Sequence, residues 1–201
     1  MVKERLSEIA PKRRSESMVG PTGIWNVEEA DGQHGSDPDL MKNLWKYFPM
    51  DEPIYDFGCG PGDYCVSLST QGFEVEGFEG TPLEHLARFH PIHQVDLAEE
   101  LVELDRANIL CLEVGEHIPP NRQQDLLHNI RKTCLNRAIV SWAIPGQGGY
   151  YHVNEQPNEV IIAEMARRGF SLHLADTLQI RKDSSFWWFK NTLMVFDRIK
   201  S

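Results

Sequence analysis

The stretch YDFGCGPGDY, residues 55–64, decides how the rest of the chain is interpreted. A short apolar segment ends at Asp56-Phe57, glycines follow at 58, 60 and 62, and a helix-like segment begins at Asp63. Glycines permit positive φ and let a ligand approach the backbone where a Cβ would block it. The G-x-G-x-G spacing differs from the G-x-G-x-x-G of dinucleotide folds, and Asp63 at the helix start would repel a pyrophosphate. We therefore expect a loop whose neighbour Asp56 suits a cationic ligand group; the alternative is a tight turn without a ligand.

Composition limits the class of protein. The chain has 201 residues, 41% of them hydrophobic, which suits one buried core and is short for two domains. The net charge of −10 makes nucleic acid an unlikely partner, because phosphate affinity needs a basic face, although residues 3–14 are locally basic. No apolar run suggests membrane insertion and no signal peptide is recognisable. Four cysteines without metal spacing are typical of free thiols in a reducing compartment, so we expect a cytoplasmic protein.

Strands and helices alternate along the chain after a helix predicted over 39–48. Strands are predicted at 54–57, 73–80, 93–97, 108–114 and 137–145, and helices at 63–72, 81–89, 121–135 and 158–170. The tail is predicted to form two more strands, 172–181 and 187–199, which give the sheet an antiparallel end. This alternation implies an α/β fold with a doubly wound sheet and helices on both faces. We expect one domain over 39–201, preceded by an N-terminal extension or cap over 1–38.

Acids at the ends of the second and third predicted strands extend the ligand hypothesis. In nucleoside-binding folds an acid about twenty residues after the glycine loop holds the ribose hydroxyls, and Glu79, followed by Gly80, has that place. Asp96 and Leu97 could take an adenine amino group and the face of its ring. The alternative for Glu79 is an ordinary acid at a strand end.

Four segments in this order, DFGCGPG (56–62), GFEG (77–80), VDL (95–97) and CLEVGEHIP (111–119), resemble the motifs of class I S-adenosylmethionine-dependent methyltransferases. The resemblance covers about Trp25 to the C-terminus. It implies S-adenosylmethionine as cofactor and a seven-stranded Rossmann-like sheet of order 3-2-1-4-5-7-6 with strand seven antiparallel. Its implied cofactor-binding residues run from the methionine end through the ribose to the adenine. They are Asp56, Gly58, Cys59, Gly60 and Gly62, then Glu79 and Gly80, then Asp96 and Leu97, with Glu113 after strand four and His34 as a further candidate.

The segment after the fourth predicted strand carries potential metal ligands. Glu113, Glu116 and His117 form an E-x-x-E-H pattern within about one helical turn. A related arrangement, completed by a later histidine, binds Mg²⁺ in methyltransferases that act on the 2′-hydroxyl of small RNAs. By that resemblance Glu113, Glu116, His117 and His152 could bind Mg²⁺ or Mn²⁺. The alternative is that Glu116 and His117 only cap the turn.

His152 has a second possible role, because it follows a glycine-rich loop that leaves the fifth predicted strand. A hydroxyl is a poor nucleophile until its proton is removed, and a histidine suits that task. His152 is therefore our candidate general base, with His117 as the second catalytic candidate. The alternative for His152 is a surface histidine without function.

Two longer segments, GIWNVEEADGQHGSD (23–37) and SWAIPGQGGYYHVNEQPNEVI (141–161), narrow the resemblance. They are similar to small methyltransferase domains of large algal DNA viruses and of some animal methyltransferase-like proteins. Some viral members are associated with O-methylation of capsid glycans, which implies a glycan or small-molecule acceptor and, for a viral protein, the host cytoplasm. Aromatic rings could stack on a sugar: Trp25, Tyr64, Tyr150, Tyr151, Trp187 and Trp188. The alternative, above all for Trp187 and Trp188, is ordinary core or interface packing. RNA ribose methylation, small-metabolite methylation and a catalytically silent partner subunit remain alternatives, and the oligomeric state is not predicted.

Overall fold

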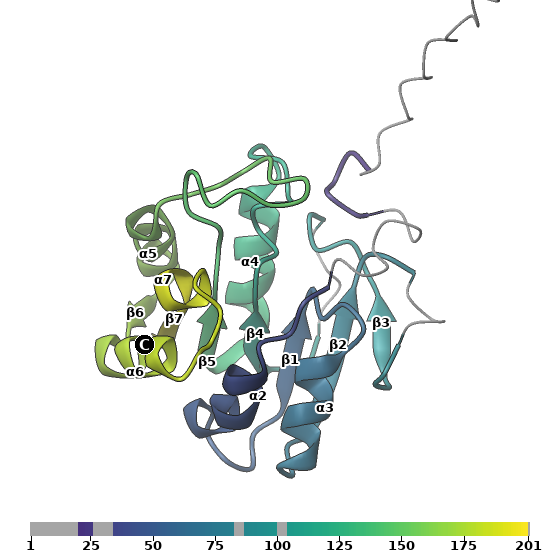
Figure 1. Ribbon diagram of the computed structural model, residues 1–201, viewed down its shortest axis with the longest axis vertical. Coiled ribbons are helices and arrows are strands. Elements are labelled where there is room, and N and C mark those ends of the chain that lie inside the picture. Colours follow the sequence, from purple (N-terminus) through teal and green to yellow (C-terminus); the bar gives the residue numbers. More distant parts are fainter. Residues whose placement is uncertain (1–19, 26–33, 83–86, 100–103, 201) are drawn as a thin grey trace, which may run out of the picture.

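The computed structural model describes residues 20–25, 34–82, 87–99 and 104–200. Its centre is one mixed β-sheet (Figure 1). Within these residues the strand order is β3-β2-β1-β4-β5-β7-β6. The parallel strands are β1 (Ile54–Phe57), β2 (Val75–Glu79), β3 (Ile92–Gln94), β4 (Ala107–Cys111) and β5 (Cys134–Val140). Strand β7 (Met194–Arg198) runs antiparallel to both β5 and β6 (Phe170–Leu172). The predicted strand order and the antiparallel strand seven are confirmed.

Helices cover both faces of the sheet, as predicted (Figure 1). On one face lie α4 (Gln123–Thr133) and α5 (Asn158–Arg167). On the other lie α2 (Pro38–Asn43), the 3-10 turn η1 (Leu44–Tyr47), α3 (Asp63–Thr70), α6 (Leu174–Lys182) and α7 (Phe189–Thr192). Strand β4 shows the reason, because successive side chains of a strand point to opposite faces. Ile109 packs in the cluster with α4 and α5, whereas Leu110 packs in the cluster with α2 and α3.

The prediction of a strand over 172–181 is wrong. That segment forms α6, and the strand that pairs with β7 lies earlier, at Phe170–Leu172. The His173 side chain caps the helix by accepting a hydrogen bond from the Asp176 amide, and Thr177 and Ile180 are buried at helical spacing. The Thr177 hydroxyl also accepts a hydrogen bond from the Val195 amide at 2.9 Å. Packing against β7 therefore outweighs the β propensity of this short apolar segment.

Two other predicted boundaries change. The strand predicted over 187–199 is divided between α7 and β7. The helix predicted over 81–89 falls partly on residues 83–86, outside the described residues, and the described residues on either side are not helical. All four cysteines are buried and unpaired, as expected of free thiols. Among the helices of the described residues, none has the length and apolar character needed to cross a bilayer.

The sheet places the carboxyl ends of β1, β2 and β4 side by side. Strand β1 pairs with β2 on one side and with β4 on the other, so the chain leaves β1 at the point where the strand order reverses. In open α/β sheets ligands bind at this point, beyond the strand ends. The glycine loop follows β1 directly, and therefore lies there.

Candidate active site

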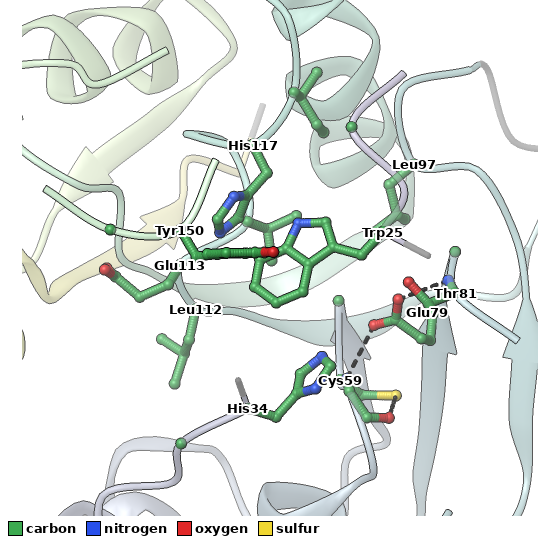
Figure 2. Close-up of a pocket in the computed structure, with 18 of the residues that line it drawn as sticks. Trp25, His34, Cys59, Glu79, Thr81, Leu97, Leu112, Glu113, His117 and Tyr150 are labelled. Carbon is green, nitrogen blue, oxygen red and sulfur yellow. Dashed lines mark hydrogen bonds between the residues drawn. The ribbon is translucent and has the colours of Figure 1, made fainter. Parts of the chain in front are cut away.

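A cavity of about 550 Å³ lies beyond these strand ends, a size that suits a small-molecule ligand (Figure 2). Most of the predicted cofactor-binding residues line it: Asp56, Gly58, Cys59, Gly60, Glu79, Gly80, Asp96, Leu97, Glu113 and His34. Gly62 does not line the cavity and instead precedes α3 as its N-cap. Both catalytic candidates, His117 and His152, line the cavity, and Glu116 does not.

The glycine loop is fixed to the end of β2 by Glu79. The Gly60 amide donates to Oε2 of Glu79 at 3.0 Å and the Thr81 amide donates to Oε1 at 2.8 Å (Figure 2). Gly60 has a φ of +52°, and a Cβ there would lie 2.5 Å from Cδ2 of His34. The absence of a side chain at position 60 therefore serves the turn and also lets the His34 ring pack on the loop. Each Glu79 oxygen keeps further lone-pair capacity, so the carboxylate can still accept from a ligand hydroxyl.

Asp56 is an acid of unusual environment at the end of β1. Its side chain is buried, and the Cys65 thiol donates a hydrogen bond to Oδ2 at 3.4 Å. Burial, aided by the charge of Glu79, raises the pKa of Asp56 to about 7 despite the hydrogen bond from Cys65. Its protonation state at neutral pH therefore depends on whether a cation lies beside it.

The adenine end of the predicted site lies past β3. Oδ1 of Asp96 accepts a hydrogen bond from the Ala98 amide at 2.9 Å, which fixes the side chain locally, and Leu97 is buried beside it. Residues 22–25 cover this end of the cavity. A Cβ on Gly80 would lie 2.7 Å from Cγ1 of Ile24, so the glycine gives room to the covering segment.

The two acids that follow β4 lie in different surroundings. Glu113 has a φ of +53°, a strained conformation for a non-glycine residue, and its amide donates to the Ser141 hydroxyl at 2.8 Å. Its Oε2 accepts from Nε2 of Gln147 at 2.6 Å. Glu116 is fully buried, and neither of its carboxyl oxygens has a hydrogen-bond partner within the described part of the chain. Burial, together with the charge of Glu113, raises the pKa of Glu116 well above its usual value.

Three of the four predicted metal ligands come together. Ligand atoms of Glu116, His117 and His152 lie within 4.8 Å of one another, and Glu113 is not part of this group. The predicted set of four is therefore reduced to three described residues. Two imidazoles and one carboxylate are a donor set that transition metals accept readily and Mg²⁺ does not prefer.

The histidine pair has a defined tautomer when both rings are neutral. Nδ1 of His117 lies 3.3 Å from the Tyr151 carbonyl oxygen, and Nδ1 of His152 lies 3.1 Å from Oε1 of Glu155. Both partners can only accept, so each Nδ1 carries the proton and each Nε2 keeps its lone pair. Burial, with the nearby His152 and His34, lowers the pKa of His117 to about 4 although the Tyr151 carbonyl opposes this. His117 is therefore neutral at physiological pH.

Glu155 was missed by the sequence analysis. Its carboxylate accepts from the Gly146 amide at 2.7 Å, from the Gly148 amide at 2.9 Å and from Nδ1 of His152. One acid therefore holds both the glycine-rich loop after β5 and the ring of the candidate base. The available signal was an acid three residues after His152, behind a loop of glycines.

Asp37 was also missed, and it joins two walls of the cavity. It caps α2, and its carboxylate accepts from the Ser184 and Ser185 hydroxyls and from the Ser185 and Phe186 amides. These hydrogen bonds outweigh burial and lower the pKa of Asp37 to about 2, so it stays ionised. Asp37 thereby connects the segment that carries His34 to the segment that carries Phe186, both of which line the cavity.

Aromatic rings surround the part of the cavity next to the histidines. The Trp25 ring centroid lies 4.9 Å from that of His117, 5.7 Å from that of Tyr150 and 5.5 Å from that of His34. Figure 2 shows the Trp25 indole between His117 and Tyr150 on one side and Glu79 and Cys59 on the other. Of the six rings predicted for a sugar site, five line the cavity and Tyr151 does not; Trp187 is 53% exposed.

Solved structures with the same fold share little sequence with this chain. The CcbJ methyltransferase from Streptomyces caelestis is 11% identical, with a TM-score of 0.63 over 92% of this chain and 100% of that one. A TehB-like SAM-dependent methyltransferase from Corynebacterium glutamicum is 20% identical, with a TM-score of 0.60 over 86% and 94% of the two chains. A magnesium protoporphyrin IX methyltransferase from Synechocystis PCC 6803, solved with bound SAH, is 16% identical, with a TM-score of 0.56 over 87% and 92%.

No protein-family model and no curated protein matches the sequence. At identities this low, structural similarity establishes the fold and not the activity. The chain has the fold of the class I S-adenosylmethionine-dependent methyltransferases.

Proposed function

We propose that the protein is an S-adenosylmethionine-dependent O-methyltransferase. One observation carries the proposal: a single cavity joins the loop of Gly60 and Glu79 to two histidines with free Nε2 lone pairs. The first part suits a nucleoside with a cationic tail, and the second suits an acceptor that must lose a proton. Residues 39–201 form the proposed catalytic domain, and the cap over 1–38 contributes Trp25 and His34 to the cavity.

The cofactor-binding roles follow the shape of the cavity. When bound, S-adenosylmethionine supplies a methyl group already activated by its sulfonium. The ionised Asp56 carboxylate favours that cationic end. Glu79 accepts from the ribose hydroxyls, and Asp96 and Leu97 hold the adenine. Ile24 and Trp25 cover the cavity and exclude water, which strengthens each of these interactions.

His152 is the proposed general base. Nε2 of His152 would take the proton of the acceptor hydroxyl, and S-adenosylmethionine would supply the methyl group to the acceptor oxygen with its thioether as the leaving group. Glu155 holds Nδ1–H of His152 and stabilises the imidazolium that forms. His117 is neutral and beside it, with ring centroids 5.1 Å apart, and can orient the acceptor hydroxyl through its own Nε2. The protein supplies alignment and proton removal, and the cofactor supplies the leaving group.

A sugar hydroxyl of a glycan is the proposed acceptor. The rings of Trp25, Tyr150 and Trp187, which line the same cavity as the two histidines, support it, because aromatic faces stack on the apolar faces of sugars. The similar structures do not distinguish between possible acceptors, because two of them are a magnesium protoporphyrin IX methyltransferase and a glycopeptide N-methyltransferase. RNA ribose and small metabolites are the alternative acceptors. We also propose a cytoplasmic location, which for a viral protein is the cytoplasm of the host.

The test is transfer of labelled methyl from S-adenosylmethionine by the purified protein alone into fractionated glycans, RNA, protein and small metabolites. We expect label in the glycan fraction and none with His152→Ala. Cofactor binding without label in any fraction would indicate a catalytically silent module and would overturn the proposal. Label in RNA would replace the sugar acceptor by a ribose.

A metal-assisted version of the same reaction is the second candidate. It is favoured by the buried Glu116 carboxyl, whose oxygens have no hydrogen-bond partner among the described residues. Glu116, His117 and His152 would hold Mn²⁺ or a similar cation, which polarises the acceptor oxygen. Binding of Mn²⁺, followed by calorimetry and paramagnetic resonance, tests this without an activity assay. Micromolar binding that Glu116→Gln abolishes supports the metal, whereas no binding and full activity in excess chelator leave the metal-free version.

A further inference from the structure

We propose that the cavity selects an acceptor that is uncharged where it enters the pocket and rejects phosphate esters and carboxylic acids. This rests on the proposed function and specifies its substrate class by charge. It therefore places free neutral glycans above RNA, whose ribose hydroxyls are flanked by phosphodiesters.

The first support is the set of charged groups around the cavity. Among the described residues, no lysine or arginine lines it, whereas five acids do: Asp56, Asp63, Glu79, Asp96 and Glu113. The undescribed internal segments 26–33, 83–86 and 100–103 contain no lysine or arginine in their sequence. A site for phosphate or carboxylate ordinarily supplies arginine, lysine or a cluster of backbone amides.

The charges of these acids are only partly balanced by their neighbours. Asp63 pairs with Arg88 at 2.6 Å, and Glu79 accepts from two backbone amides. The cationic end of the cofactor would balance Asp56. Among the described residues, Glu113 accepts hydrogen bonds from two neutral donors, the Gln147 amide at 2.6 Å and the Thr192 hydroxyl at 3.5 Å. These donors are uncharged, so they do not neutralise the Glu113 carboxylate, which would repel an anionic acceptor in the cavity.

An anionic group of an acceptor would enter a lining that contains the Glu113 carboxylate and, among the described residues, no lysine or arginine. At the effective dielectric constant of a partly buried site, a like charge about 6–12 Å away weakens binding by roughly 10- to 100-fold.

The second support is the form of the acceptor wall. Trp25, Tyr150 and Trp187 come from three separate segments of the chain, and all three line the cavity. Trp25 and Tyr150 contact each other edge to face, at a centroid distance of 5.7 Å and an interplanar angle of 71°. Aromatic rings and acids that line one cavity suit a neutral ring with hydroxyl groups, which can stack on the former and donate hydrogen bonds to the latter.

The experiment compares matched probes on the protein loaded with S-adenosylhomocysteine, by saturation-transfer NMR. The probes are phenyl glucoside, its 6-phosphate and phenyl glucuronide, which share the rings and differ in charge. We expect transfer to phenyl glucoside and at least about tenfold weaker binding of both anions. Equal binding of the three overturns the charge selection, and no transfer to phenyl glucoside overturns the acceptor class.

Variants at the exposed Trp187 separate charge from shape. Trp187→Arg should raise the affinity for the two anionic probes, whereas Trp187→Leu, which removes the ring without adding charge, should not. Gain of anion binding in both variants would mean that the indole excludes the probes by size, contrary to the proposal.

Anion-exchange chromatography of the methyl-labelled products gives the functional readout. Label in the unretained fraction supports the proposal, and label in phosphatase-sensitive retained material overturns it. If no product is labelled but phenyl glucoside still binds better than the two anionic probes, the proposed methyl transfer is contradicted and the charge selection is not.

Discussion

The protonation of Asp56 should control cofactor affinity between pH 5.5 and 7. Its carboxyl is buried beside the glycine loop and has a pKa of about 7 in the free protein. A sulfonium and an ammonium of the bound cofactor stabilise the ionised form, so the cofactor binds best to the fraction of protein in which Asp56 is charged. The replacement Asp56→Asn keeps the size of the side chain and fixes it in a neutral form.

The magnitude follows from that pKa. With a pKa of 7, about 3% of Asp56 is ionised at pH 5.5 and about half at pH 7, a ratio of about 16. Affinity of the wild-type protein for S-adenosylmethionine should therefore rise by roughly tenfold over this interval. Binding at pH 7 should release about half a proton, because the remaining protonated fraction must ionise. The cofactor ammonium stays protonated throughout this range and contributes little to the change.

Titration calorimetry at both pH values, in buffers of different ionisation enthalpy, measures the affinity and the protons released. The matched control is Asp105→Asn, because Asp105 is exposed and does not line the cavity. The control should behave as the wild type, and Asp56→Asn should bind weakly with little dependence on pH and no proton release. A wild-type affinity independent of pH, or an Asp56→Asn variant with the wild-type pH profile, would refute the reasoning.

Four further outcomes are expected. In the free protein the raised pKa of Asp56 means that the native state holds the proton more tightly than the unfolded state. Asp56 should therefore lower the free energy of unfolding by up to about 4 kcal/mol as the pH rises from about 4 to about 7. Denaturant titrations should show a fall smaller by that amount in Asp56→Asn, in which the buried Glu116 still contributes. Glu79→Ala should weaken cofactor binding by about 1–3 kcal/mol in calorimetry, because the ribose hydrogen bonds and the link to the Gly60 amide are both lost. His152→Ala should lower turnover by about 10²–10⁴-fold with cofactor affinity nearly unchanged, and loss of both together would assign His152 to pocket shape instead. Glu155→Gln should lower kcat by about 10- to 100-fold while cofactor affinity is kept, since Gln cannot accept from all three of its present donors, and an unchanged kcat would remove Glu155 from the mechanism.

The fold could be predicted where the local sequence pattern of a segment and its tertiary contacts favour the same secondary structure. The glycines after β1 and the apolar runs of β1 and β4 require a buried parallel strand followed by a tight turn, and both are present. The segment 172–181 offers no such agreement, because alternating and helical burial both fit its few apolar residues. The choice is made by Thr177, which bonds to the Val195 amide, and this contact spans 18 residues. Local patterns do not contain that information.

The candidate site, too, could be predicted only in part from the local sequence. The spacing of Glu113 and Glu116 suggested two ligands one helical turn apart, but that inference assumed helical backbone between them. Glu113 has a φ of +53°, which directs its side chain to Gln147 and leaves Glu116 buried with the two histidines. The partners that orient the site come from distant segments, since Asp37 holds Ser184 across 147 residues of sequence. Spacing along the chain predicts candidate site residues, whereas the turn at Glu113 and these long-range hydrogen bonds determine which of the candidates lie together.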